Sequence, residues 1–134
     1  MRRDLSETRE FFKGDRYAVH SGIVIDEVGD GYALCSMDIR DYHKNVRDVV
    51  MGGVIFTLAD LCYGAACDGQ ACSMTSEISF LHAAKGNRLI AEARRIKEGR
   101  TTVFYEVRVT DENGTLIAFV TMTGYRFQEV KPKP

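Results

Sequence analysis

The decisive stretch of this sequence lies near its middle, where residues 51–69 read MGGVIFTLADLCYGAACDG. It is the most apolar part of the chain and is long enough for four or more helical turns. A helix that is apolar on nearly all sides must be wrapped by other structure, because packing along one stripe would leave apolar surface in water. The stretch therefore predicts a buried central helix with the rest of the fold curled around it.

Strand signals lie on both sides of this helix. The predicted strands are residues 20–27, 32–39, 75–82, 89–97, 101–110 and 115–127, the last four as a meander. In the strand at 101–110 apolar and polar side chains alternate, and Asn113-Gly114 is typical of a tight hairpin turn. A short helix is expected at 4–13. The pattern predicts an α+β fold in which one curved antiparallel sheet of about six strands encloses the helix.

Length and charge restrict the class of protein. The 134 residues predict a single domain, 1–134, with an N-terminal helical segment at 1–16 and a C-terminal tail at 128–134. With 18 basic and 19 acidic residues the net charge is −1, which gives no general attraction to nucleic acid or to a membrane. No run approaches the roughly 20 apolar residues of a membrane span, and no signal peptide is recognisable. The expected location is the cytoplasm.

The cysteines and histidines do not have the spacing of a metal site. Cys35, Cys62, Cys67 and Cys72 form no C-x-x-C pair, and the three histidines are widely dispersed. We expect reduced, buried thiols and no metal or redox cofactor.

Asp60 is the unusual residue of the central helix. Gly53, Thr57, Asp60 and Gly64 are spaced 4, 3 and 4 residues apart, so they form one narrow small or polar stripe. A carboxylate among apolar neighbours is costly to bury without partners. Two interpretations are open: a structural Asp that bonds a neighbouring segment, or a base or nucleophile whose pKa is raised in a poorly hydrated cleft.

The start of the helix offers a second functional feature. At Gly52-Gly53 the backbone can approach a ligand closely, and the first amides of a helix have no intrahelical partner. These amides suit an oxyanion site for a polarised carbonyl. Alternatively, the two glycines only let the chain turn into a crowded helix.

Residues 45–60 carry a family resemblance. The pattern N-x5-M-G-G-x4-L-A-D resembles the H-G-G-x4-L-A-D signature of hotdog-fold acyl-CoA thioesterases, most closely the PaaI-type branch of phenylacetate degradation. The resemblance extends over residues 17–127 and includes TSEISFL at 75–81. It implies the hotdog fold and hydrolysis of an acyl-CoA thioester to a carboxylic acid and coenzyme A. Coenzyme A is then part of the substrate, and no separate cofactor is implied.

The resemblance also implies roles for individual residues. Asp60 corresponds to the acidic nucleophile or general base, Gly52 to the N–H donor that polarises the thioester carbonyl, and Asn45 to a side chain that helps hold it. Ser73 corresponds to a hydroxyl that positions the attacking water, with Thr75 as the alternative.

Further substrate contacts are expected from residues around this set. Gly53 and Met51 flank the oxyanion site. His43 either lines the substrate entrance or is a solvated loop residue, and Tyr63 is either a pocket residue or a core aromatic whose hydroxyl is satisfied. The basic residues between 85 and 100 either bind coenzyme A phosphates or belong to a solvated hairpin.

Met51 departs from the family pattern, because it replaces the usual histidine before Gly-Gly. A thioether donates no hydrogen bond, so a non-catalytic acyl-CoA binding or sensing module on the same fold is the alternative function. A hotdog hydratase is disfavoured, since those enzymes pair a histidine with their carboxylate.

The spacing of Gly52 and Asp60 predicts self-association. The two residues are eight positions apart on one helix, so their backbones are separated by roughly 12 Å along the axis. An Asp side chain is too short to close that gap. We therefore expect a two-fold dimer whose sites take Gly52 and Asn45 from one chain and Asp60 from the other, and the resemblance implies pairing of dimers into tetramers.

Overall fold

The computed structural model describes residues 2–128. Its elements in chain order are α1 (Leu5–Phe12), α2 (Arg16–His20), β1 (Val24–Gly29), β2 (Tyr32–Asp38), the 3-10 turn η1 (Asp41–His43), α3 (Gly52–Ala66), β3 (Ala71–Phe80), β4 (Arg88–Glu98), β5 (Thr102–Asp111) and β6 (Leu116–Arg126). The predicted tail at 128–134 lies, beyond residue 128, outside the described residues. None of the helices in the described chain is long and apolar enough to cross a membrane.

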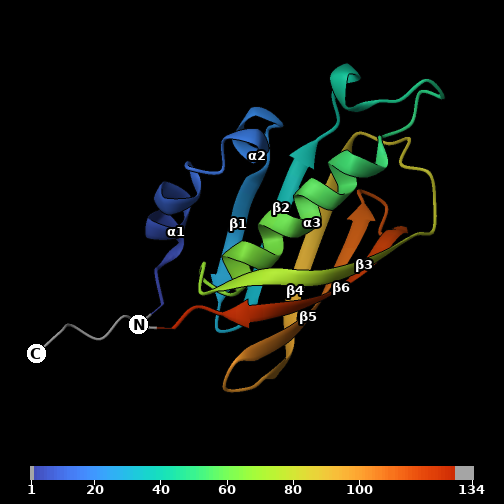
Figure 1. Cartoon of the computed structure of the whole chain (residues 1–134). Coiled ribbons are helices and arrows are strands. Elements are labelled where there is room, and N and C mark those ends of the chain that lie inside the picture. Colours follow the sequence, from blue (N-terminus) through green and yellow to red (C-terminus); the bar gives the residue numbers. More distant parts are fainter. Residues whose placement is uncertain (1, 129–134) are drawn as a thin grey trace, which may run out of the picture.

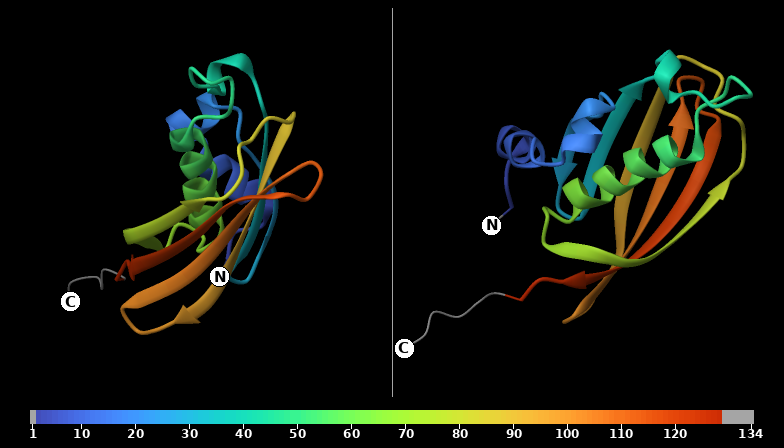
Figure 2. Two further views of the ribbon diagram at one scale, coloured as in Figure 1. Left: turned by 90° about the vertical axis from the view of Figure 1, so that its right-hand side faces the viewer. Right: turned by 45° about the horizontal axis from the view of Figure 1, so that its top comes forward.

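The strands form one curved antiparallel sheet in the order β1-β2-β4-β5-β6-β3. Helix α3 lies across its concave face (Figure 1). Figure 2 shows from two further directions how the sheet curves around this helix. The predicted α+β fold with a wrapped central helix is therefore confirmed.

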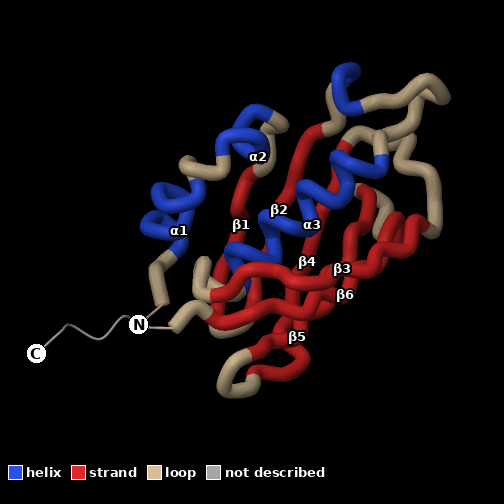
Figure 3. The backbone as a smooth tube through the Cα atoms, viewed as in Figure 1, coloured by secondary structure: helices blue, strands red, loops and turns tan. Residues whose placement is uncertain are grey.

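The predicted meander is wrong for its first strand. β3 pairs with β6, for example Ser79 with Phe119, rather than with β4. The reason is that β4 is already paired with β2 on one side and with β5 on the other. β3 therefore forms one edge of the sheet and runs beside α3 (Figure 3).

Helix α3 packs closely on the sheet because the strands beneath it present small side chains. Leu58 and Cys62 on the helix and Ala33, Ala91 and Ala93 on β2 and β4 are all fully buried. The Cys62 Sγ lies 3.4 Å from the carbonyl oxygens of Ala33 and Ala91, so its single S–H donor can reach either of them. Close packing of this kind holds the helix in a fixed position relative to the sheet.

The N-terminal segment differs from its prediction. α1 begins as expected, with Asp4 and Glu7 forming a reciprocal cap, but residues 16–20 form the helix α2 and β1 starts only at Val24. Five residues are too few to show a helical period. Because β-branched residues follow directly, the predicted strand began too early in the chain. Phe12 of α1 packs over Gly64, where an added Cβ would lie 3.2 Å from the ring.

The cysteines are all free, as expected, but they are not all buried. Cys35, Cys62 and Cys67 are buried, whereas Cys72 is exposed. The prediction failed for Cys72 because it lies on the edge strand β3, which has neighbours on one side only.

Candidate active site

The N-terminus of α3 has unpartnered amides. Met51 precedes the helix in an extended conformation and contributes no side-chain cap. Within residues 2–128 the N–H groups of Gly52 and Gly53 donate no hydrogen bond, whereas Val54 and Ile55 donate to the Met51 carbonyl. The positive end of the helix dipole and two free donors therefore meet at Gly52.

Only one of the two glycines is crowded by a neighbouring side chain within the single chain. A Cβ on Gly52 would lie 3.0 Å from the Phe80 ring, whereas a Cβ on Gly53 would have no neighbour within 4 Å. The crowded-helix interpretation therefore applies to Gly52 and not to Gly53. Gly53 lies on the exposed face of the helix.

Asn45 is held so that its amide nitrogen is available. Its side-chain oxygen accepts from the N–H of Arg47 at 2.9 Å and of Val49 at 3.4 Å. Because both partners are donors, the atom between them must be the oxygen, and the NH2 group points elsewhere. An NH2 group is the part of the amide that can hold a carbonyl oxygen.

His43 is part of the protein interior. It is 2% exposed, its Nδ1 accepts from the Arg40 N–H at 2.9 Å, and its Nε2 lies 2.9 Å from the Ser21 carbonyl. The hydrogen bonds assign the proton to Nε2 and leave no ring nitrogen for a substrate. Both predictions for His43, a solvated loop residue or a wall of the substrate entrance, are therefore wrong. Its ring fixes the loop that carries Asn45.

Asp60 lies at the surface of α3 in a concavity of about 370 Å³ between α2 and α3, here called the Asp60 hollow. Asp15 and Tyr17 of the α2 segment and Phe56 of α3 contribute to its lining. In the described part of the chain no hydrogen bond or ion pair engages the Asp60 carboxylate. Loss of solvent raises the pKa of Asp60, and the negative charge of Asp15 raises it further.

Gly52 faces a different concavity. The Gly52 hollow, of about 360 Å³, is walled by apolar side chains that include Val50, Ile55, Phe80 and Leu81. The two hollows share no lining residue. Within one chain, therefore, the candidate carbonyl-polarising amide and the candidate base do not face the same space.

The remaining predicted residues have different environments. Ser73 and Thr75 are exposed on β3, on either side of an irregularity in its pairing with β6. Tyr63 is a core residue, edge-on to Tyr105 with ring centroids 5.3 Å apart. Its hydroxyl has no hydrogen-bond partner in residues 2–128, and burial raises its pKa. The hydroxyl is thus buried as expected for a core aromatic, but unsatisfied.

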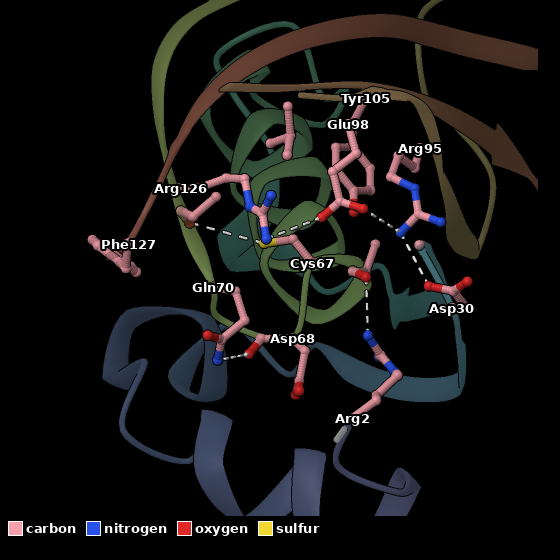
Figure 4. A pocket seen from close by; sticks show the side chains of 14 residues that line it. Arg2, Asp30, Cys67, Asp68, Gln70, Arg95, Glu98, Tyr105, Arg126 and Phe127 are labelled. Carbon is pink, nitrogen blue, oxygen red and sulfur yellow. Dashed lines mark hydrogen bonds and ion pairs between the residues drawn. The ribbon is translucent and has the colours of Figure 1, made fainter. Parts of the chain in front are cut away.

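A further cavity, of about 390 Å³, lies at the C-terminal end of α3 (Figure 4). Its wall carries a chain of ion pairs in which Asp30 binds Arg95 at 3.0 Å, Arg95 binds Glu98 at 3.6 Å, and Glu98 binds Arg126 at 3.6 Å. Arg95, one of the basic residues that the sequence suggests as coenzyme A phosphate ligands, lines it, but none of the predicted catalytic or acyl-binding residues does. The two acidic and two basic side chains neutralise one another. We interpret these ion pairs as contacts that hold the strands together at this end of the sheet.

The charged residues do not assemble a metal site. Among the described residues no three His, Cys, Asp or Glu side chains are grouped as metal ligands. The three arginines of β4 have local partners. Arg88 pairs with Asp38, Arg94 pairs with Glu92 and stacks on Tyr32, and Arg95 turns into the cavity of Figure 4.

A curved six-stranded sheet around a central helix is the class of fold that the sequence predicted. Residues 48–118 match the thioesterase superfamily, so the chain belongs to that family. Its fold is the hotdog fold, and its relatives include the PaaI branch.

Three relatives illustrate the similarity. A candidate esterase of Archaeoglobus fulgidus is 33% identical over 125 residues, which cover 90% of this chain and 81% of that protein. The acyl-coenzyme A thioesterase PaaI of Escherichia coli is 26% identical over 119 residues, with 86% and 85% covered. Its solved structure superposes with a TM-score of 0.80 at 25% identity, over 87% of this chain and 92% of that one.

The third is a Streptococcus mutans protein whose structure has acetyl CoA bound. It superposes with a TM-score of 0.76 at 26% identity, covering 82% of this chain and 92% of that one.

Proposed function

We propose that this protein hydrolyses an acyl-CoA thioester to a carboxylic acid and coenzyme A. The observation that carries the proposal is the unpaired Asp60, whose pKa is raised, on the same helix that begins with the free amides of Gly52 and Gly53. A general base and a carbonyl-polarising donor are the two groups that this reaction needs. Membership of the thioesterase superfamily and the named activity of E. coli PaaI support it.

The chemistry follows from these roles. Asp60 takes a proton from water, and the water oxygen attacks the thioester carbon. The N–H of Gly52 and the NH2 of Asn45 hold the developing oxyanion. When the tetrahedral intermediate collapses, the C–S bond breaks and the leaving thiolate takes the proton back from Asp60. An alternative route forms an acyl anhydride on Asp60, which water then hydrolyses.

We further propose that the site is completed by a second chain. Gly52 and Asp60 face separate hollows, so each chain holds two half-sites. β3 is an edge strand beside α3, and exposed apolar side chains, Met74, Phe80 and Leu81, lie along and just after it. In a two-fold dimer the Gly52 hollow of one chain meets the Asp60 hollow of the other. Ser73, or Thr75 in its place, then positions the attacking water.

A second candidate function is acyl-CoA binding without hydrolysis. The observation that favours it is Met51, whose exposed thioether stands where the family has histidine and makes no hydrogen bond within the described chain. The discriminating experiment incubates the protein with aryl-, short- and long-chain acyl-CoA thioesters and measures free thiol and bound ligand. Thiol release that depends on Asp60 supports hydrolysis, whereas saturable binding without release supports the binding module.

A further inference from the structure

We propose that the carboxylate of Asp15 faces Asp60 across the hollow between α2 and α3 and tunes it as a base. The inference rests on the proposed function, because it assigns Asp60 the role of base. Asp15 acts through Asp60 and is a positioning residue rather than a catalytic one. It lies outside residues 48–118, the part of the chain that matches the thioesterase superfamily.

Asp15 has the position of a helix cap but does not act as one. It is the residue before α2, where an Asp side chain normally accepts from the first amides of the helix. Here the side chain makes no such hydrogen bond. In residues 2–128 no ion pair engages it either, and Asp15 is exposed and lines the Asp60 hollow.

Two acidic residues, Asp15 and Asp60, therefore line the hollow, and neither side chain has a hydrogen-bond or ion-pair partner within residues 2–128. The charged and titratable groups around Asp60 are Asp15, Arg16 and Tyr17 from the α2 segment and Tyr63 from α3. Arg16 forms no ion pair with either carboxylate in the described residues. The second negative charge is thus uncompensated, and like-charge repulsion favours the protonated form of Asp60.

Repulsion of this kind strengthens a general base. Apolar walls from Phe56 and Leu61 reduce the solvation of Asp60, and Asp15 adds its charge to that effect. Both raise the pKa of Asp60 toward neutral pH, and a general base is most effective when its pKa lies near the pH of the reaction. The geometry gives the N-terminal segment a role in catalysis without contact to the substrate.

A direct titration tests the proposal without any assay of activity. The carboxyl carbon of Asp60 is followed by NMR against pH in the ¹³C-labelled full chain, with its signal identified by its loss in Asp60→Asn. Asp15→Asn should lower the pKa of Asp60 by a few tenths of a unit or more, whereas Asp15→Glu should keep most of the wild-type value. Glu10→Gln is the matched control, because it makes the same change of charge on the exposed face of α1. An Asp60 titration that is the same in Asp15→Asn as in Glu10→Gln overturns the proposal.

Rate measurements then separate this inference from the proposed function. The acid limb of kcat/KM against pH should move to lower pH in Asp15→Asn, with a lower plateau, and should stay in place in Glu10→Gln. If Asp60 titrates as expected but no thioester is hydrolysed, the pairing of the carboxylates stands and the proposed reaction fails. If hydrolysis depends on Asp60 but neither the titration nor the acid limb moves, the role of Asp15 fails.

Discussion

Asp60 has no hydrogen-bond or ion-pair partner among the described residues and lies on a mostly apolar helix, so its replacement tests the proposed reaction directly. Asp60→Asn keeps the volume and removes the basic oxygen, so turnover of acyl-CoA should fall by at least about 100-fold. The measurement is thiol release under single-turnover conditions, with circular dichroism as a check on folding. A variant with wild-type turnover and a lowered melting temperature would show that Asp60 is structural.

The same substitution has a pH-dependent effect on stability. The pKa of Asp60 is higher in the folded protein than in the unfolded chain, so its contribution favours folding at low pH and is lost as pH rises through the folded value. Asn carries no charge. Asp60→Asn should therefore melt above wild type at pH 7, and the difference should vanish below about pH 4, the ordinary range of Asp. A difference that grows toward low pH would contradict the direction of this shift.

Met51→His restores the histidine of the family pattern at an exposed position. The Met51 side chain is 52% exposed, so an imidazole has room without disturbing the core. We expect hydrolysis to rise or to stay unchanged, with the same melting temperature. Lost activity at unchanged stability would instead show that the thioether is matched to the substrate of this protein.

At the residue scale, the sequence predicts a side chain's environment where that environment is formed by residues nearby in the chain. Asp60 was identified from its apolar neighbours on one helix, and the structure places it in the hollow without a partner. His43 was misjudged because its burial depends on Ser21, which lies 22 residues away. The vacant cap at Asp15 was also missed, since nothing in the sequence shows that its carboxylate leaves the α2 amides free.

At the scale of elements, the contact between α3 and β6 depends on Tyr63 and Gly124. A Cβ on Gly124 would overlap the Tyr63 hydroxyl, and both residues are buried. Gly124→Ala should therefore destabilise the protein by about 1–3 kcal/mol. Tyr63→Phe should cost little by itself, because the hydroxyl it removes has no partner in the described chain.

The double variant provides the control for this contact. The hydroxyl is the nearest obstacle to the added methyl group, and the next atoms lie 3.1 Å away on Val103 and 3.2 Å away at the Cys72 carbonyl oxygen, so Tyr63→Phe should reduce the cost of Gly124→Ala without removing it. Urea denaturation of the four proteins measures the coupling. Additive costs would show that the two residues do not compete for the same space.

Elements were predictable to the extent that their signals are local. The alternation of Val103, Tyr105, Val107 and Val109 and the Asn113-Gly114 turn placed β5 and β6 within one residue of their observed bounds at every end. The position of β3 depends on which strand edges the rest of the sheet leaves free. No pattern within residues 71–80 records that choice, which is why the meander was predicted instead.

At the scale of the whole molecule, the division of Gly52 and Asp60 between two hollows predicts complementation. A chain with Asp60→Asn and a chain with Gly52→Pro are each expected to be inactive. In a hybrid dimer the intact Gly52 of the first chain meets the intact Asp60 of the second, and one site works. Equal mixing should restore about a quarter of wild-type activity.

The control is a mixture of each inactive chain with itself, treated in the same way. Subunit exchange is verified by mass spectrometry of differently labelled chains. Verified hybrids that remain inactive would contradict the shared site while leaving the hotdog fold untouched.

The pairing of β3 with β6 also affects how the protein is made on the ribosome. β3 is synthesised before β4 and β5, yet its partner, residues 116–126, emerges only after both of them. Until then the nascent chain holds a finished apolar helix and an edge strand that has no partner. Such intermediates expose the surfaces that chaperones bind and that promote aggregation. Truncation just before residue 116 removes β6 itself and also leaves β3 without a strand to pair with, so two strands are lost from the sheet.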